Sequence, residues 1–156
     1  MKKPKIFIGT DHAGFKLKEE IKNFLAKQDY EVEDMGAYSY NENDNYPEFV
    51  CKAAKKVSEN PGSKGIIFGG SGQGEAIAAN KVKGIRAALF YGNKMDIVTL
   101  SRAHNDANIL SLGARFLNKK EAAEAVRLWL STEFSKEERH KRRINQISII
   151  EEKQCK

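Results

Sequence analysis

A glycine-rich stretch that ends in a carboxylate is the part of this sequence best suited to chemistry. Residues 66–81 read IIFGGSGQGEAIAANK, so an apolar run leads through four glycines in six residues to Glu75. Glycine permits positive φ and lets a ligand approach bare backbone, and a following helix N-terminus adds partial positive charge. The loop is therefore expected to hold an anion through residues Gly70, Ser71, Gly72, Gln73 and Gly74.

Spacing tests the familiar phosphate-binding motifs. A P-loop needs Lys and then Ser or Thr after its last glycine, where this chain has Glu75 and Ala76. The dinucleotide fingerprint also fails, because its final position falls on Glu75 or Ile77. A loop that attracts negative charge while carrying its own carboxylate suits proton abstraction from carbon, with the amides holding the resulting oxyanion. A tight strand-to-helix turn, with Glu75 as a helix N-terminal charge, fits the loop equally well.

Metal and disulfide chemistry are disfavoured by the other reactive residues. The three histidines are His12, His104 and His140, and none has a His or carboxylate at metal-binding i, i+4 spacing. Acid–base or hydrogen-bonding roles are left for them, and His12 could simply cap the next helix. Cys51 and Cys155 lie far apart without a CxxC pattern, which predicts free thiols.

Five alternations of apolar strand and amphipathic helix position these residues. Strands are expected over 5–9, 31–35, 65–68, 87–90 and 108–112, and helices over 15–25, 47–57, from 75, over 93–103 and over 119–130. Such alternation predicts a three-layer α/β/α fold with a doubly wound, five-stranded parallel sheet and a C-terminal helical extension.

In such sheets ligands bind beyond the carboxyl ends of the strands. That edge should carry Asp11 and His12 after the first strand, the glycine loop after the third, and Arg115 after the fifth. The long loop 36–46 ends at the same edge, so Tyr46 is expected to form a wall. Arg86 precedes the fourth strand and belongs to the opposite edge, where a structural or solvated role is expected.

His104, Asn105 and Asp106 precede the fifth strand and should also lie at the opposite edge, far from Glu75 within one chain. If they take part in chemistry, a second copy of the chain must supply them, which predicts a homo-oligomer with shared sites. The alternative is a helix C-terminus at which His104 favours the dipole.

The C-terminal segment, residues 135–156, carries much of the positive charge. Glu137 and Glu138 are spaced to pair with Lys141 and Arg142, whereas Arg139 and Arg143 lie on one face without such partners and could bind a phosphate. Ile144, Ile147 and Ile150 continue as an apolar stripe that needs the domain or a partner to cover it. A solvated basic helix or a nucleic-acid patch is the alternative, although no interleaved aromatics or nucleic-acid module accompany it.

Length and composition bound the remaining possibilities. A chain of 156 residues with 40% hydrophobic and 31% charged residues is expected to form a single domain over 1–156. It has no spanning apolar stretch and no signal-peptide core, so we expect a soluble cytoplasmic protein without membrane partners. The net charge of +6 suits nucleic acid, a membrane surface or a phosphorylated small molecule, and does not choose among them.

Taken in order, the motifs resemble the ribose-5-phosphate isomerase B family, which includes galactose-6-phosphate isomerase subunits. The likeness covers nearly the whole chain. Its motifs are residues 9–14 (GTDHAG), 69–75 (GGSGQGE), 77–81 (IAANK), 84–88 (GIRAA), 101–108 (SRAHNDAN), and Arg139, His140 and Arg143. One branch of the family carries a catalytic Cys where this chain has Gly69, and the other uses a Glu at the position of Glu75. The sequence is similar to the glutamate branch.

The resemblance implies a role for each motif. Glu75 would be the catalytic base, and His104 with Asn105 would assist opening of the sugar ring. Asp11 and His12 would contact the sugar. The phosphate would be held by residues Arg115, Arg139 and Arg143.

The resemblance also implies the assembly and the reaction. It implies a Rossmann-like sheet of strand order 2-1-3-5-4, homodimers or homotetramers with sites at subunit boundaries, and no metal or other cofactor. The expected reaction interconverts ribose 5-phosphate and ribulose 5-phosphate through a cis-enediolate. An isomerase of a six-carbon sugar phosphate is the first alternative, and a non-catalytic nucleotide- or flavin-binding module is the second.

Overall fold

Strands and helices alternate along the chain in the computed structural model, which describes residues 2–154. The strands are β1 (Ile6–Thr10), β2 (Val32–Asp34), β3 (Lys64–Gly69), β4 (Ala87–Phe90) and β5 (Ile109–Gly113). The helices are the short 3-10 helix η1 (His12–Gly14), α1 (Phe15–Lys27), α2 (Tyr46–Glu59), α3 (Gln73–Ala79), α4 (Asp96–Ala103), α5 (Lys119–Ser131) and α6 (Glu138–Gln154).

All five strands form one parallel sheet of order β2-β1-β3-β5-β4. The central strands pair in a register that sets Ile8 beside Ile66 and Ile66 beside Leu110. The doubly wound sheet predicted from the alternation is confirmed, and so is the strand order implied by the family resemblance. Because the strand order reverses between β1 and β3, the carboxyl ends of these two strands border the usual ligand crevice.

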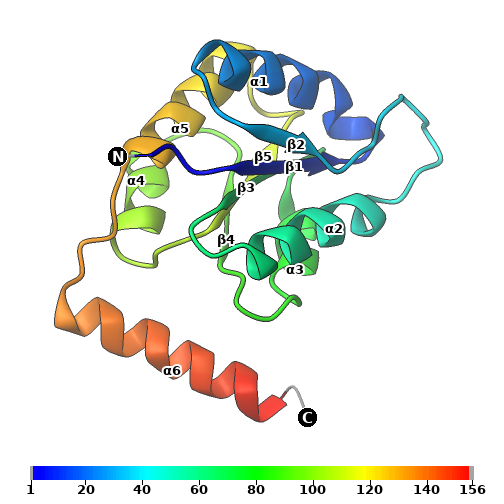
Figure 1. Ribbon diagram of the computed structural model, residues 1–156. Coiled ribbons are helices and arrows are strands. Elements are labelled where there is room, and N and C mark those ends of the chain that lie inside the picture. Colours follow the sequence, from blue (N-terminus) through cyan, green and yellow to red (C-terminus); the bar gives the residue numbers. More distant parts are fainter. Residues whose placement is uncertain (1, 155–156) are drawn as a thin grey trace.

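Helices cover both faces of the sheet, with α1, α4 and α5 on one side and α2 and α3 on the other (Figure 1). Alternate residues of β1 therefore serve two cores: Ile6 and Ile8 pack with α1 and α5, whereas Phe7 packs with α2. Strands buried on both faces read as continuous apolar runs, which is why β1 and β3 were visible in the sequence.

Local chemistry explains where the helices begin. Asn118 and Glu121 form a reciprocal capping box at the start of α5. Helix α4 begins at Asp96, three residues after the predicted start, because Asn93 has a φ of 79°, a left-handed value that a helix cannot contain. Helix α3 begins at Gln73 and not at Glu75, because Gly72 reverses the chain with a φ of 77°.

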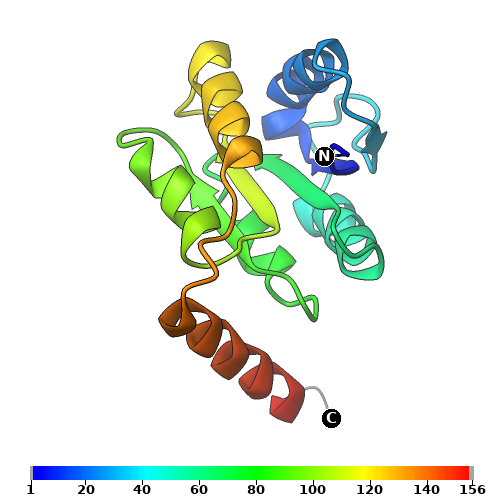
Figure 2. The same cartoon turned by 60° about the vertical axis from the view of Figure 1, so that its left-hand side comes forward.

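Helix α6 stands away from the rest of the molecule at the end of an extended connection (Figures 1 and 2). Neither hydrophobic core contains a residue of α6. Its Ile147 and Ile150 are 51% and 56% exposed, so the predicted apolar stripe is largely uncovered in the single chain. None of the helices in the described part of the chain is long and apolar enough to cross a bilayer.

Candidate functional site

Glu75 lies in the first turn of α3 and is only 4% exposed. Its carboxylate packs against the backbone of Gly69 at the end of β3. A Cβ atom added to Gly69 would lie 1.9 Å from Glu75 Oε1, so any side chain at this position would displace the carboxylate. Glycine at residue 69 is therefore what allows the carboxylate to occupy the end of the strand.

The environment of Glu75 suits a base. Burial raises the pKa of the Glu75 carboxyl above its usual range, and the nearby negative charge of Asp11 raises it further, while the backbone N–H of Glu75 opposes both effects. A carboxylate with a raised pKa is a stronger proton acceptor than an exposed one. The residue therefore has both the burial and the electrostatics that proton abstraction needs.

The glycine loop leaves backbone donors available next to this carboxylate. Within residues 2–154, the N–H groups of Gly70, Ser71 and Gly72 donate to no protein acceptor, whereas Gln73 N–H donates to Ser71 Oγ at 3.3 Å. The loop is held from β5, since Ala114 N–H and Arg115 N–H donate to the carbonyls of Gly69 and Gly70. A fixed loop with free N–H groups can stabilise an oxyanion.

Two further predicted residues border the same loop. Tyr46, at the start of α2, brings its hydroxyl to within 2.6 Å of where a Cβ on Gly74 would lie. Arg115 brings Nη1 to within 3.1 Å of the corresponding position on Gly70 and is exposed. The predicted wall and the predicted cation both lie at the carboxyl edge of the sheet.

Asp11 and His12 follow β1 at this edge. Asp11 is buried and caps η1, accepting hydrogen bonds from Ala13 N–H and Gly14 N–H. His12 is fixed by Asp44, whose Oδ1 accepts from the His12 N–H at 2.9 Å and lies 2.7 Å from Nδ1. Since a carboxylate can only accept, the contact assigns the ring proton to Nδ1. The same contact leaves Nε2 as the ring nitrogen available to a ligand.

Asp11, His12 and Asp44 also form the one group of three potential metal ligands found among the described residues, with ligand atoms within 4.8 Å of one another. Sequence spacing could not reveal this group, because Asp44 comes from the loop before α2. Asp11 Oδ1 and Asp44 Oδ1 already accept N–H donors, and Nδ1 of His12 faces Asp44. The group is organised as a hydrogen-bonded cluster that orients His12.

His104 and Asn105 lie at the other edge of the sheet, as predicted. They follow α4, and Arg86 at the start of β4 donates to the Asn105 carbonyl. The His104 ring stacks on His140 of α6 with centroids 4.2 Å apart. His140 is 2% exposed, although it lies in a basic run of the sequence. Its burial, together with the charge of His104, lowers the pKa of the His140 ring.

Neither ion pair predicted for α6, Glu137 with Lys141 or Glu138 with Arg142, is found among the described residues. Arg139 is not free of partners, because its Nε donates to Glu137 at 2.8 Å. Lys141 pairs with Glu138 at i, i+3 and not with Glu137 at i, i+4. Glu137 precedes the helix, so it can turn back toward Arg139. Arg143 is exposed on the same helix face as Arg139. Both arginines are remote from Glu75 within one chain.

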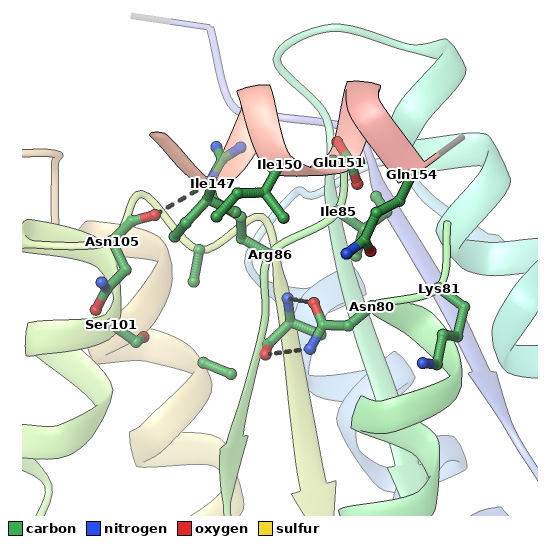
Figure 3. Close-up of a pocket in the computed structure, with 13 residues that line it drawn as sticks. Asn80, Lys81, Ile85, Arg86, Ser101, Asn105, Ile147, Ile150, Glu151 and Gln154 are labelled. Atoms are coloured by element: carbon green, nitrogen blue, oxygen red, sulfur yellow. Dashed lines mark hydrogen bonds between the residues drawn. The ribbon is translucent and has the colours of Figure 1, made fainter. Parts of the chain in front are cut away.

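A sizeable cavity lies away from Glu75. It measures about 660 Å³ and separates α6 from the end of α3 and the start of β4 (Figure 3). Ile85, Ile147 and Ile150 contribute its apolar lining, and Asn105 and Arg86 lie at one end. The cavity lies beneath the uncovered stripe of α6 and shares Ile147 and Ile150 with it.

Sequence reasoning missed Asp44 and did not foresee the contacts through which Arg86 fulfils its expected structural role. Asp44 is one of several acidic and amide residues in the loop before α2, and nothing in its spacing distinguishes it. Arg86 was correctly placed at the edge opposite Glu75, but its contacts depend on a turn between α4 and β5 whose shape the sequence does not disclose.

Comparison with known proteins adds independent evidence. Residues 6–147 match the family model described as Ribose/Galactose Isomerase. Ribose-5-phosphate isomerase B of Mycobacterium tuberculosis is 41% identical over 147 residues, covering 94% of this chain and 90% of the relative.

Solved structures agree with the sequence relatives. Ribose-5-phosphate isomerase B of Clostridium thermocellum superposes with a TM-score of 0.90 at 46% identity, covering 96% of this chain and 98% of that one. The Mycoplasma genitalium enzyme, solved with bound ribulose 5-phosphate, has a TM-score of 0.90 at 38% identity, covering 95% and 96%.

Proposed function

The chain belongs to the ribose/galactose isomerase family, and on this premise we propose that it interconverts ribose 5-phosphate and ribulose 5-phosphate. Relatives that are about 40% identical over most of the chain carry the name ribose-5-phosphate isomerase B, and one of them was solved with ribulose 5-phosphate bound. The observation in this chain that carries the proposal is the buried carboxylate of Glu75 against Gly69, beside the unpaired amides of the glycine loop.

Glu75 is the proposed base. Once the sugar ring is open, its carboxylate takes the proton from C2, the C–H electron pair forms the C1–C2 double bond, and O1 becomes an oxyanion. Glu75 then returns the proton to C1, while a proton moves from O2 to O1 and C2 becomes the ketone. The N–H groups of Gly70 to Gly72 would stabilise the enediolate, and each such donor is typically worth about 2.7–4 kcal/mol of barrier.

The remaining groups are proposed to come from two chains. Asp11, His12, Tyr46 and Arg115 border the glycine loop of their own chain, whereas His104, Asn105, Arg139 and Arg143 lie at the far edge or on α6. We propose a homodimer, or a tetramer built from such dimers, in which a second copy supplies the latter set. The uncovered isoleucines of α6 support an interface there.

Ring opening is the proposed task of His104 and Asn105. The C1–O4 bond must break while the proton of the O1 hydroxyl leaves and a proton reaches O4, and an imidazole near both oxygens can carry that exchange. Asp11 and His12 would contact the sugar. The phosphate would meet Arg115 from one chain and Arg139 and Arg143 from the other, since guanidinium groups bind phosphate oxygens in a fork. A cytoplasmic location stays a prediction.

Glu75→Gln tests the proposal. The substitution keeps the side-chain volume but removes the base, so turnover of ribose 5-phosphate should fall by about 10²- to 10⁴-fold while KM changes little. The measurement is a coupled isomerase assay on ribose, allose and galactose phosphates, with Glu124→Gln, which makes the same change at a surface glutamate of α5, as the matched control. Near-parental turnover by the Glu75→Gln variant would reject Glu75 as the base. Absence of parental activity on ribose 5-phosphate would reject the pentose substrate.

A further inference from the structure

The turn after His104 is held by one carboxylate between two arginines. Asp106 adopts a left-handed φ of 46°, which is uncommon for a residue with a side chain. Its Oδ1 accepts from Arg102 Nη1 at 2.7 Å, and its Oδ2 accepts from Arg86 Nη2 at 3.1 Å. The two ion pairs compensate the unusual backbone conformation and fix the direction in which the chain leaves α4.

Arg86 also donates hydrogen bonds to the backbone next to His104. Its Nε donates to the carbonyls of Asn105 at 3.0 Å and Asp106 at 3.1 Å, and its Nη2 donates to the Asp106 carbonyl at 2.9 Å. Figure 3 shows the contact with Asn105 at the end of the cavity beside Ile147. A planar guanidinium imposes its geometry on such a set of acceptors, which a lysine cannot do.

Arg102 anchors the same turn from its other side. It is 8% exposed, its Nη1 donates to the Ala107 carbonyl at 2.7 Å, and its Nε donates to the Thr132 carbonyl at 3.3 Å. The guanidinium also lies 5.8 Å from the buried ring of Trp129. The turn is therefore tied to the body of the domain, although Asn105 itself is exposed.

We propose that Arg86 and Asp106 are positioning residues for the ring-opening step, because they hold His104 and Asn105 in the geometry in which one chain presents them to its partner's site. The inference rests on the proposed function. An exposed turn that must place an imidazole on a substrate needs rigid support, since a misplacement of about 1 Å can cost about 10²-fold in rate. Arg86 therefore does more than the structural role expected from its place at the far edge.

The chemistry of the two sugar phosphates makes it possible to distinguish a defect in ring opening from a general loss of stability. Ribose 5-phosphate is mostly a furanose and must open before Glu75 can act. Ribulose 5-phosphate cannot close a five-membered ring, because its O5 carries the phosphate, so Glu75 can remove a C1 proton from it directly. A variant that misplaces only His104 and Asn105 should lose the first reaction and keep the second.

The experiment compares these two reactions in Arg86→Met, Arg86→Lys and Asp106→Asn. For Arg86→Met we expect kcat/KM for ribose 5-phosphate to fall by about 10- to 100-fold, while the exchange of C1 protons of ribulose 5-phosphate with D₂O stays within about threefold of the parental rate. Arg86→Lys should lose less. Asp106→Asn tolerates the left-handed backbone and removes only the charge, so it gives the same split if Arg86→Met does not fold.

Arg127→Met is the matched control, since it removes an exposed arginine paired with Glu124 on α5 and should leave both reactions unchanged. The inference is overturned if folded Arg86 and Asp106 variants isomerise ribose 5-phosphate normally, or if they lose both reactions equally. Lack of both reactions in the parental protein would instead reject the proposed function.

Discussion

At the scale of single residues, the properties of Glu75 depend on two neighbours, the carboxylate of Asp11 and the glycine at residue 69. Gly69 leaves the space that the Glu75 carboxylate fills, and Asp11 lies close enough to raise its pKa. Asp11 is itself held by two backbone N–H groups, so it cannot move away from Glu75 without giving up its cap. Burial is the main cause of the raised pKa of Glu75, and Asp11, a neighbour with a separate structural task, adds to it.

Asp11→Asn should shift the pH profile of catalysis. Glu75 must be ionised to act, so kcat/KM falls as the pH drops through its raised pKa. Asparagine keeps the cap through its carbonyl oxygen but removes the charge, so the acid limb should move to lower pH while staying above the usual value of about 4.3, because burial remains. Profiles of kcat/KM for both proteins measure the shift.

The ionisation of the substrate phosphate near pH 6 is the same for both proteins, so any difference between the two profiles belongs to the enzyme. An unmoved acid limb would show that Asp11 does not act on the titrating group.

Gly69→Ala should separate activity from stability. The three atoms nearest to the added methyl all belong to the end of the Glu75 side chain, which can swing aside. We therefore expect kcat/KM to fall by about 10²-fold while the free energy of unfolding changes by less than about 1 kcal/mol. Urea denaturation and the isomerase assay measure the two effects.

Gly14→Ala is the contrasting variant, because its methyl would meet Phe68 Cβ at 2.5 Å and the Phe68 backbone at 2.9 Å. Overpacking there should cost about 1–3 kcal/mol. Full activity in Gly69→Ala would mean that the carboxylate works from another position.

Asp11, His12, the glycine loop and Arg115 could be predicted because they follow their strands within a few residues, so the topology alone brings them together. Asp44 could not, since its contact with His12 depends on the path of a loop with no regular structure. The pairing of Arg139 with Glu137 was missed for a similar reason: helix spacing describes neighbours within α6, whereas Glu137 precedes its first turn.

At the scale of elements, the apolar runs of β1, β3 and β5 were placed to within about one residue, because strands buried on both faces carry strong patterns. Helix starts were less accurate wherever a left-handed residue decides them, as Asn93 does before α4. Neighbouring elements are also joined by polar contacts that hydrophobic periodicity does not reveal. The clearest example is the ion pair that joins α1 to β2.

Lys18 on α1 is fully buried and donates to both carboxylate oxygens of Asp34 at 2.8 Å and to the Ala37 carbonyl at 2.6 Å. Lys18→Met should destabilise the fold by about 3 kcal/mol, because it removes the fully buried partner of the partly buried Asp34 carboxylate. Lys22→Met removes a second, more exposed partner of the same carboxylate and should cost about 1 kcal/mol or less. Urea denaturation at neutral pH measures both.

The same ion pair predicts how the stability of the fold depends on acid pH. Burial opposes ionisation of Asp34, but hydrogen bonds from Lys18, Lys22 and the Gly36 N–H outweigh it, so the pKa of the Asp34 carboxyl is lowered. A carboxyl whose folded-state pKa is lowered contributes stability above its unfolded pKa of about 3.9 and loses it as the pH falls further. In Lys18→Met this acid-dependent part of the stability should be smaller. Equal costs for the two lysine variants would contradict the burial argument.

At the scale of the whole molecule, the sheet separates the proposed catalytic groups. Glu75 lies at the carboxyl edge, whereas His104 and Asn105 lie at the opposite edge, next to the start of β4. Parallel topology imposes this separation, which is why the sequence already predicted it. The direction in which α6 leaves the domain could not be predicted, because few contacts with the body of its own chain fix it.

Mixing two inactive proteins tests whether two copies complete each site. Glu75→Gln and His104→Ala chains should each have little activity alone. In a hybrid dimer, one site would combine the intact Glu75 of one chain with the intact His104 of the other, while the second site carries both defects. Random exchange makes half of the dimers hybrid, so the mixture should recover about one quarter of the parental activity.

The measurement is kcat/KM for ribose 5-phosphate after subunit exchange, with a mass tag on one variant to quantify the hybrid. The matched control mixes Glu75→Gln with Arg115→Ala, because both residues belong to the carboxyl edge of one chain. Arg115→Ala by itself should retain turnover and chiefly raise KM. Recovery that tracks the hybrid fraction requires His104 to act across the interface. If hybrids form and stay inactive, His104 must act within its own chain, and the opposite edges of the sheet would have to communicate by some route other than a second copy.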